Sequence, residues 1–307
     1  VEDQLREIRQ NLPDNYYNGL PQLAEGELRG YPRVYALALA LIAHTDSRLD
    51  VSALRRFLIA FQKVAPLTIG ELWAIGITLR IALFEHLTPI ALRIVSARRN
   101  REEADALADG LLAMSVRPEV SAADLIRHFS RSLGDPRSFD RALTVQLIQR
   151  LRDQVPMVWP AFDWLETQLC AMGTSCERVT QLDHHRQAAS HVTVGNIIVS
   201  MRLLSALDWR EFIESVSMPD RVLETDPAEE YSRMDFSTRD FYRHALERIA
   251  KRSRLSEREV AVKAVDLSSS HPRGSRENHI GFWLIGRGRT TLEREAGYRL
   301  RWRERIS

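Results

Sequence analysis

Residues 69–87, Ile-Gly-Glu-Leu-Trp-Ala-Ile-Gly-Ile-Thr-Leu-Arg-Ile-Ala-Leu-Phe-Glu-His-Leu, decide the fold class of this chain. Apolar side chains would surround a helix of this sequence on nearly every side, which is typical of a central helix packed by others. Every second residue from Ile75 to Leu83 is also apolar, a pattern that fits a buried strand. The length of the stretch and a capping box at its start, Thr68 with Glu71, favour the helix.

Similar start signals recur along the chain. In a capping box, a Ser or Thr and a Glu three residues later each satisfy a backbone N–H of the other residue. Four strict cases and two weaker ones with Asp are present: Thr68/Glu71, Thr174/Glu177, Ser256/Glu259, Thr290/Glu293, Ser121/Asp124 and Ser237/Asp240. Helix breakers, Pro89 among them, divide the chain into about ten helical segments. The sequence therefore predicts an all-α fold, an irregular multi-helix bundle or array of about ten helices without a regular repeat.

The C-terminal part of the chain differs in composition. Residues 268–275, Ser-Ser-Ser-His-Pro-Arg-Gly-Ser, lack apolar periodicity and predict a linker. The apolar run 279–286 that follows predicts a short strand-like segment. We therefore expect a helical domain over residues 1–267, with a subdivision near 115–137 left open. Residues 268–307 would hold the linker, a Gly/Arg-containing segment and a basic tail.

Composition limits the class of protein. The 307 residues are 44% apolar and 27% charged, as in globular proteins. Two cysteines, Cys170 and Cys176, are too few for a disulfide scaffold or a four-cysteine zinc site. The longest apolar run, residues 34–43, is shorter than the about 20 residues of a membrane-spanning helix, so we expect the isolated chain to be soluble. With 43 basic and 41 acidic residues interspersed, no nucleic-acid partner is expected.

Signatures of catalysis are missing from the sequence. It has no Gly-x-Ser-x-Gly elbow and no Walker loop, which disfavours a serine hydrolase and a P-loop ATPase. It also has no His-Glu-x-x-His zinc motif. No two aspartates stand two residues apart, as they do in the Asp-x-Asp pair of nucleotide-sugar transferases. We therefore expect no catalytic residue, no metal ligand and no cofactor in this chain.

One glycine-rich turn is a candidate contact site. Gly286, Arg287, Gly288 and Arg289 precede a helix expected from Thr290, so backbone N–H groups and two guanidinium groups could contact a phosphate or a partner. The spacing matches no dinucleotide-binding fingerprint, and a tight turn packed on the helical core explains the glycines equally well. Both interpretations stay open at the level of sequence.

Eight phrases of the sequence resemble the N-terminal region of bacterial cyclic β-1,2-glucan synthases, and together they span nearly the whole chain. The phrases are 20–26 (LPQLAEG), 30–37 (GYPRVYAL), 43–47 (AHTDS), 65–73 (APLTIGELW), 146–154 (QLIQRLRDQ), 192–203 (VTVGNIIVSMRL), 235–243 (DFSTRDFYR) and 279–289 (HIGFWLIGRGR). Proteins of that family are very large inner-membrane enzymes. Such a helical region precedes their first membrane helices, a glycosyltransferase domain that uses UDP-glucose, a cyclising domain and a glycoside-phosphorylase domain.

The resemblance implies a role without catalysis for this chain. The family's catalytic residues lie downstream, and none maps onto these residues. UDP-glucose and a divalent metal would serve the transferase domain of the parent protein. Basic residues just before a membrane helix favour the cytoplasmic side and anionic lipid. The resemblance thus implies a domain on the cytoplasmic side of the bacterial inner membrane, with membrane-surface contacts through Arg299, Arg301, Arg303 and Arg305.

Two hypotheses follow from this resemblance. In the first, the helical domain docks on the glycosyltransferase domain of its own polypeptide and supports it near the membrane. In the alternative, it is a regulatory or ligand-binding module that recognises UDP-glucose, glucan or a partner subunit. Aromatic rings stack on sugar faces, and the sequence offers six candidates for such a platform: Trp159, Trp164, Trp209, Tyr16, Tyr17 and Tyr31.

Overall fold

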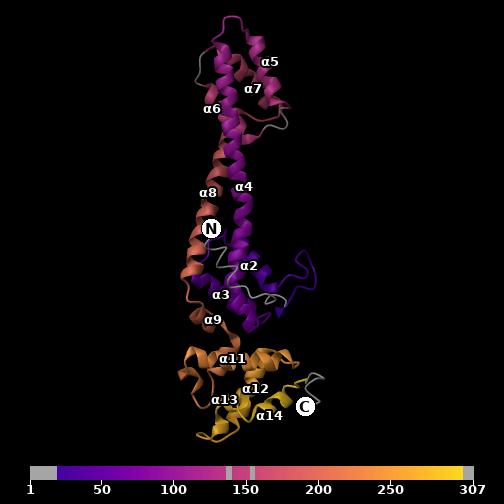
Figure 1. Cartoon of the computed structure of the whole chain (residues 1–307), viewed down its shortest axis with the longest axis vertical. Helices are drawn as coiled ribbons and strands as arrows, with labels where there is room; N and C mark the ends of the chain where they lie inside the picture. The colour runs from indigo at the N-terminus through magenta and orange to yellow at the C-terminus, as the bar shows by residue number, and fades with distance from the viewer. Residues whose placement is uncertain (1–18, 136–139, 153–155, 300–307) are drawn as a thin grey trace. The chain divides into compact units, whose positions relative to one another are not determined.

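The computed structural model describes residues 19–135, 140–152 and 156–299. In this part of the chain no strand forms beyond one isolated antiparallel bridge between Gln22 and Pro32. The α-helices are α2 Arg33–His44, α3 Val51–Gln62, α4 Ile69–Ser115, α5 Ala122–Leu133, α6 Arg141–Arg152, α7 Trp159–Ala171, α8 Cys176–Ala206, α9 Trp209–Val216, α10 Met218–Leu223, α11 Phe236–Lys251, α12 Glu257–Ser269, α13 Ile280–Leu284 and α14 Arg289–Glu295 (Figure 1). The predicted all-α fold is confirmed.

The chain forms two compact units. Unit 1 combines residues 1–82 with residues 199–307, and unit 2 consists of residues 83–198. The long helices α4 and α8 each contribute to both units. This division differs from the predicted one, in which residues 1–267 form a domain that ends at a linker. The described part of 268–299 instead packs with α11 and α12 in one hydrophobic cluster.

In unit 1, helices α10 to α14 enclose this cluster together with the first residue of α4. Its larger buried members are Ile69, Leu223, Tyr231, Tyr242, Leu246, Ile249, Val260, Ile280, Trp283, Leu284 and Leu292. A buried ion pair links α11 to α10, with Arg243 Nε 2.9 Å from Asp220 Oδ1. The start of α4 is tied to α2 by Arg33, whose Nε lies 2.6 Å from Glu71 Oε1.

In unit 2, α5, α6 and α7 gather around the C-terminal half of α4 and the start of α8 (Figure 1). The buried residues of this second cluster include Ala104, Ala108, Leu111, Leu125, Phe129, Leu147, Ile148, Leu151, Leu165, Leu169 and Cys176. The small Ala104 and Ala108 stand one helical turn apart on α4, which leaves room for the large side chains that face them. Each unit therefore has its own hydrophobic core.

The central helix predicted over 69–87 is confirmed, and it continues much further than predicted. Helix α4 runs to Ser115 and contains Pro89. Pro89 was expected to break the helix, since proline lacks a backbone N–H and crowds the preceding turn. That expectation was wrong. Pro89 is exposed, and the hydroxyl of the preceding Thr88 donates to Phe84 O at 2.9 Å.

Helix α4 is also long and apolar enough to cross a membrane, by length and composition alone. Helices α8 and α9 pass the same test as a pair bent by 91°. Half of the apolar window of α4 is buried within the protein, as expected of a core helix. This stretch of α4 contains polar residues such as Arg80 and Glu85, so it does not form an uninterrupted apolar run like residues 34–43.

Two local predictions require correction. The strand-like segment predicted over 279–286 is helix α13 instead, and Ile280, Gly281, Trp283 and Leu284 are its buried residues. Their spacing follows one face of a helix, and a short apolar run does not distinguish a strand from a buried helix. A Cβ at Gly281 would also collide with the Tyr242 hydroxyl, so this position accepts only glycine without a shift.

The capping boxes of Ser256 and Ser121 form as predicted, and Thr68 caps α4 with Glu71. The box predicted from Thr290 does not form, because α14 begins one residue earlier, at Arg289, and Glu293 binds Arg289 at 2.7 Å.

Candidate functional site

Two cavities lie side by side in unit 1, next to the first turns of α4. The first has a volume of about 420 Å³ and the second about 590 Å³, and both are lined by Gly70 and Glu247. Such volumes fall in the range of about 300–1,000 Å³ that small-molecule sites occupy. We call the two cavities together the α4–α11 groove.

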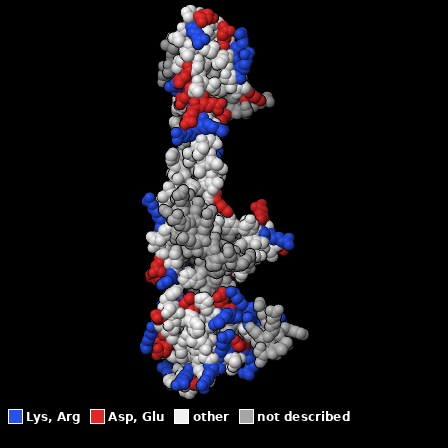
Figure 2. All heavy atoms as spheres, viewed as in Figure 1, with Lys and Arg blue, Asp and Glu red and all other residues white. Residues whose placement is uncertain are grey.

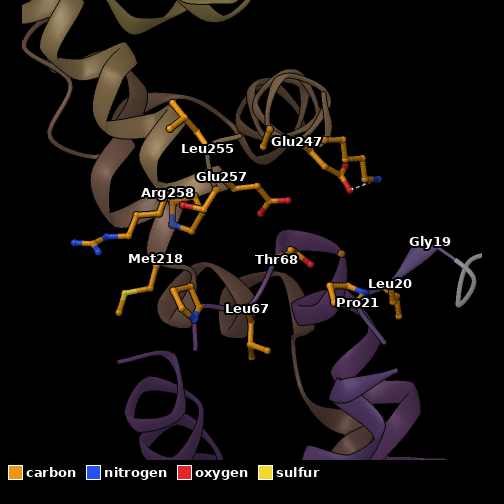
Figure 3. Close-up of a pocket in the computed structure, with 16 residues that line it drawn as sticks. Gly19, Leu20, Pro21, Leu67, Thr68, Met218, Glu247, Leu255, Glu257 and Arg258 are labelled. Atoms are coloured by element: carbon orange, nitrogen blue, oxygen red, sulfur yellow. Dashed lines mark ion pairs between the residues drawn. The ribbon is translucent and has the colours of Figure 1, made fainter. Parts of the chain in front are cut away.

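The first cavity is built from five parts of unit 1. The chain at Gly19–Pro21, the turn that precedes α4, the start of α10, the end of α11 and the start of α12 form its walls (Figure 3). The side chain of Glu257 extends into it from α12 (Figure 3). Glu257 is buried, with only 6% of the residue exposed. Its Oε2 accepts a hydrogen bond from the backbone N–H of Ile69 at 2.7 Å. A carboxylate from α12 thus satisfies an N–H group at the N-terminus of α4.

Glu257 titrates near neutral pH in this setting. Burial disfavours its charged form and raises its pKa to about 7, against the opposing hydrogen bond from Ile69 N–H. Nearby carboxylates, Glu247 and Glu71, add to the rise, while Lys251 opposes it. At slightly acidic pH the Glu257 carboxyl is protonated and able to donate a hydrogen bond.

Helix α11 presents a row of charged and polar residues to the groove. Asp240, His244, Glu247 and Lys251 follow the spacing of one helical face. The first three line cavities of the groove with α4, and Lys251 extends the row into the first cavity. Lys251 Nζ lies 2.8 Å from Glu247 Oε1, and His244 Nδ1 lies 3.3 Å from Asp240 Oδ2. The row therefore alternates acceptors and donors along about three turns.

Aromatic rings from α4, α9 and α11 also line the second cavity. Trp73 of α4 meets Phe236 of α11 edge to face, with ring centroids 6.2 Å apart. Trp209 of α9 lies so close to Gly76 that a Cβ there would come within 2.8 Å of the indole ring. Arg210 stacks on Phe236, with its guanidinium carbon 5.0 Å from the ring centroid. The second cavity thus combines three half-buried aromatic rings with charged side chains.

Unit 2 carries a different feature, an exposed apolar surface. Six consecutive residues of α4, 91–96, are exposed, although a helix in a folded unit usually buries one side. The large apolar side chains exposed on α4 and on the neighbouring part of α8 are Leu92, Ile94, Val95, Leu182, Val192 and Ile198. We call these six residues the α4–α8 apolar surface. In Figure 2 the surface over this stretch of the two helices is largely uncharged.

The residues predicted as a phosphate or partner contact lie in the turn between α13 and α14. The backbone N–H groups of Gly286 and Gly288 donate to carbonyl oxygens of α13, at 3.0 Å each, and that of Arg289 donates to Gly286 O at 3.2 Å. A Cβ at Gly288 would come within 2.7 Å of the rings of Phe282 and Trp283. This geometry accounts for the glycines by packing, and the predicted contact of Arg287 and Arg289 stays a prediction.

Of the residues predicted to face the membrane, the structure describes only Arg299. Arg301, Arg303 and Arg305 lie outside the described residues. Arg299 is exposed, and its N–H donates to Arg252 O at 2.8 Å. It shares a shallow hollow with three other cationic residues, Lys251, Arg252 and Arg254.

The four described residues of the predicted aromatic platform are divided between the two units. Trp159 and Tyr31 are exposed in different units, at 60% and 54%. Trp164 packs edge to face on Phe129 in the core of unit 2. Tyr16 and Tyr17 lie outside the described residues, and Trp209 alone lines the groove.

The thiols and metal-binding side chains form no cluster in the described ranges. Burial raises the pKa of Cys176 to about 11, and Cys170 is exposed. In the part of the chain that the structure describes, no three His, Cys, Asp or Glu residues are placed to hold a metal ion. The sequence reading missed Trp73, Phe236 and the α11 row. The spacing of Asp240, His244, Glu247 and Lys251 was visible in the sequence, but the partner that faces them depends on tertiary packing.

The structure therefore defines an all-α chain of two units, with a mixed aromatic and charged groove in one unit and an exposed apolar surface in the other. No protein-family model matches the chain. It is 32% identical over 305 residues to the cyclic beta-(1,2)-glucan synthase NdvB of Rhizobium meliloti (strain 1021). The alignment covers 97% of this chain and 10% of the synthase, so the chain spans about a tenth of the relative's length. The match confirms the predicted resemblance, and the chain is similar to one segment of that synthase.

Proposed function

We propose that the chain is the non-catalytic N-terminal domain of a cyclic β-1,2-glucan synthase-like membrane protein. In this proposal it lies on the cytoplasmic side of the bacterial inner membrane. It docks on the glycosyltransferase domain of its own polypeptide, which uses UDP-glucose, and supports that domain. The relative is about ten times longer than this chain, so most of such a polypeptide lies outside the segment described and offers a partner surface.

The α4–α8 apolar surface carries the docking proposal. Leu92 and Val95 are 64% and 67% exposed, and Val192 is 58% exposed. Exposed apolar side chains that share a helix face, as Leu92 and Val95 do at a spacing of three residues, mark contact surfaces, since their burial against a partner is favourable. On the face that Figure 2 shows, few charged atoms lie over this stretch, which fits a protein partner better than a lipid headgroup surface; Arg93 is the exposed charged residue within 91–96.

The proposed membrane contact is supported by a second surface. Lys251, Arg252, Arg254 and Arg299 share one shallow hollow in unit 1. Basic side chains near an anionic leaflet contribute about 1 kcal/mol each. In this proposal the basic residues of the hollow contact the membrane together with the C-terminal basic residues predicted from the sequence.

The docking proposal is tested in the full-length synthase with Leu92→Glu and Val192→Glu. A charge buried at a protein contact is costly, so both variants should lower glucan synthesis and the melting temperature of the synthase. Ala113→Glu, on an exposed position of α4 outside the apolar surface, is the matched control and should have no effect. Equal behaviour of all three variants and the unmodified protein would refute docking through this surface.

A further inference from the structure

We propose that the α4–α11 groove binds a neutral oligosaccharide of the glucan class. The choice of glucan rests on the proposed membership in a glucan synthase, whereas the binding site itself does not depend on docking. The groove lies in unit 1, and the α4–α8 apolar surface lies in unit 2.

The aromatic wall has the chemistry that sugar rings require. A pyranose presents C–H groups on its faces and hydroxyl groups at its edge, so its sites combine aromatic rings with polar side chains. Trp73, Trp209 and Phe236 supply the rings from three different helices. Trp209 is fixed in place, because its indole N–H donates to Leu204 O at 3.0 Å and its ring lies against Gly76.

Trp73 points to a ligand in a second way. Its ring is half-buried, and its N–H has no hydrogen-bond acceptor in the described part of the chain, in contrast to that of Trp209. This N–H is not one of the buried polar atoms without a partner, so it is accessible to solvent and to a ligand. A hydroxyl oxygen of a sugar in the second cavity would serve as this acceptor.

The polar wall offers both kinds of hydrogen-bonding groups that hydroxyls need. Asp240 and Glu247 are acceptors, with side chains 30% and 20% exposed. Arg210 is a donor; no carboxylate among the described residues pairs with it, and its stacking on Phe236 holds it at the cavity. Each hydroxyl donates one hydrogen bond and accepts others, so a wall of mixed donors and acceptors suits it.

The charge balance favours a neutral ligand over a sugar nucleotide. In the second cavity Arg80 and Arg210 stand against Asp240 and Glu247, so the formal charges cancel. In the first cavity Lys251 and Arg258 stand against Glu247 and Glu257. Because Glu247 lines both cavities, the groove as a whole holds four cations, Arg80, Arg210, Lys251 and Arg258, and three carboxylates, Asp240, Glu247 and Glu257. A diphosphate would meet these three carboxylates, which costs binding energy.

The two cavities together suit a chain of sugars. They share Gly70 and Glu247, so a ligand that fills the second cavity reaches the first without leaving the protein surface. The Glu257 carboxyl at the far wall would bind a further hydroxyl (Figure 3).

The test is calorimetric titration of the 307-residue chain with a linear β-1,2-linked glucopentaose, a β-1,4-linked glucopentaose and UDP-glucose. We expect saturable binding of the β-1,2-linked probe. Trp73→Phe, which keeps the ring but removes the N–H, and Asp240→Asn should each weaken it about tenfold. Arg248→Ala, on an exposed position of α11 outside the groove, is the matched control and should change the affinity less than twofold.

Three results would overturn the proposal: no saturable heat with either saccharide, equal affinities in all variants, or saturable binding of UDP-glucose alone. Equal binding of both saccharides would support a glucan site without linkage selectivity. Circular dichroism spectra that match the unmodified chain show that each variant is folded. Loss of docking leaves these titrations unchanged, so the two proposals fail independently.

Discussion

The imidazole of His279 is held by Asp226, whose Oδ2 lies 2.8 Å from His279 Nδ1. The other ring nitrogen, Nε2, lies 3.0 Å from the hydroxyl of Tyr242. Asp226 Oδ1 also accepts the backbone N–H of Ile280 at 3.1 Å. One buried carboxylate therefore joins the end of the α10 region to α11 and to the start of α13.

The first prediction concerns this carboxylate. Burial alone would raise the pKa of Asp226, but hydrogen bonds from His279 and Ile280 outweigh it and lower the pKa below its usual value. A lowered folded pKa stabilises the protein above the unfolded value of about 4, and this contribution is lost as the pH falls through the folded value. Asp226→Asn should therefore cost about 1–3 kcal/mol at pH 7 and less at pH 3. Urea unfolding at both pH values measures this, and an equal cost at both would contradict it.

The second prediction has the opposite sign and concerns Glu257. Its pKa is raised to about 7, so the folded state holds a proton that the unfolded state releases above about pH 4. Stability from this group is thus full at low pH and falls as the pH rises toward 7. Glu257→Gln keeps an acceptor for the Ile69 N–H and should remove this dependence on pH. The difference in free energy of unfolding between the variant and the unmodified chain should therefore shift in favour of the variant by up to about 3 kcal/mol from pH 4 to pH 8. Parallel pH profiles of the two proteins in urea unfolding would count against it.

The third prediction concerns the close approach of Gly76 and Trp209. A Cβ at residue 76 would lie 2.8 Å from the indole ring, so Gly76→Ala should destabilise the chain by about 1–3 kcal/mol. Gly110→Ala on the same helix meets nothing within 4 Å and should stabilise it, by up to about 1 kcal/mol. Thermal unfolding of both variants gives the comparison. A stabilised Gly76→Ala variant would show that the ring is not fixed there.

The fourth prediction concerns the cationic hollow. Lys251→Glu with Arg254→Glu should weaken binding of the chain to vesicles that contain anionic lipid, by more than tenfold, since each basic residue contributes about 1 kcal/mol. Arg117→Glu, exposed in unit 2, is the control and should have little effect. The difference should shrink at high salt. Sedimentation with vesicles measures it, and unchanged binding of the double variant would exclude the hollow as a lipid contact.

Much of the fold could be predicted where local chemistry decides it. The capping box of Ser256 and Glu259 fixed the start of α12, and the apolar surround of residues 69–87 fixed the start of α4. The prediction of a break at Pro89 was wrong, because an exposed proline is tolerated within a long helix whose neighbouring residues pack, as Leu83 and Ile90 do here. The prediction of a strand over 279–286 was wrong for another reason, since a short apolar run has too few residues to distinguish helix from strand periodicity.

The candidate site was harder to predict. Trp209 was named as an aromatic candidate, but its partners Trp73 and Phe236 come from other helices and are far away in sequence. The clearest sequence signal for the site is Gly76, because a glycine is unusual within a strongly apolar helix. The structure explains this glycine, since the ring of Trp209 packs directly against it. Neither the groove nor the α4–α8 apolar surface follows from any one segment.

The central claim, docking on the transferase domain, is tested most directly by site-specific photo-crosslinking in the full-length synthase. A photoreactive amino acid replaces Val95 or Val192 in the α4–α8 apolar surface, and Ala113 serves as the control position. We predict crosslinks from Val95 and Val192 to peptides of the glycosyltransferase domain, identified by mass spectrometry, and none from Ala113. Crosslinks from these positions only to lipid or to solvent would contradict the claim.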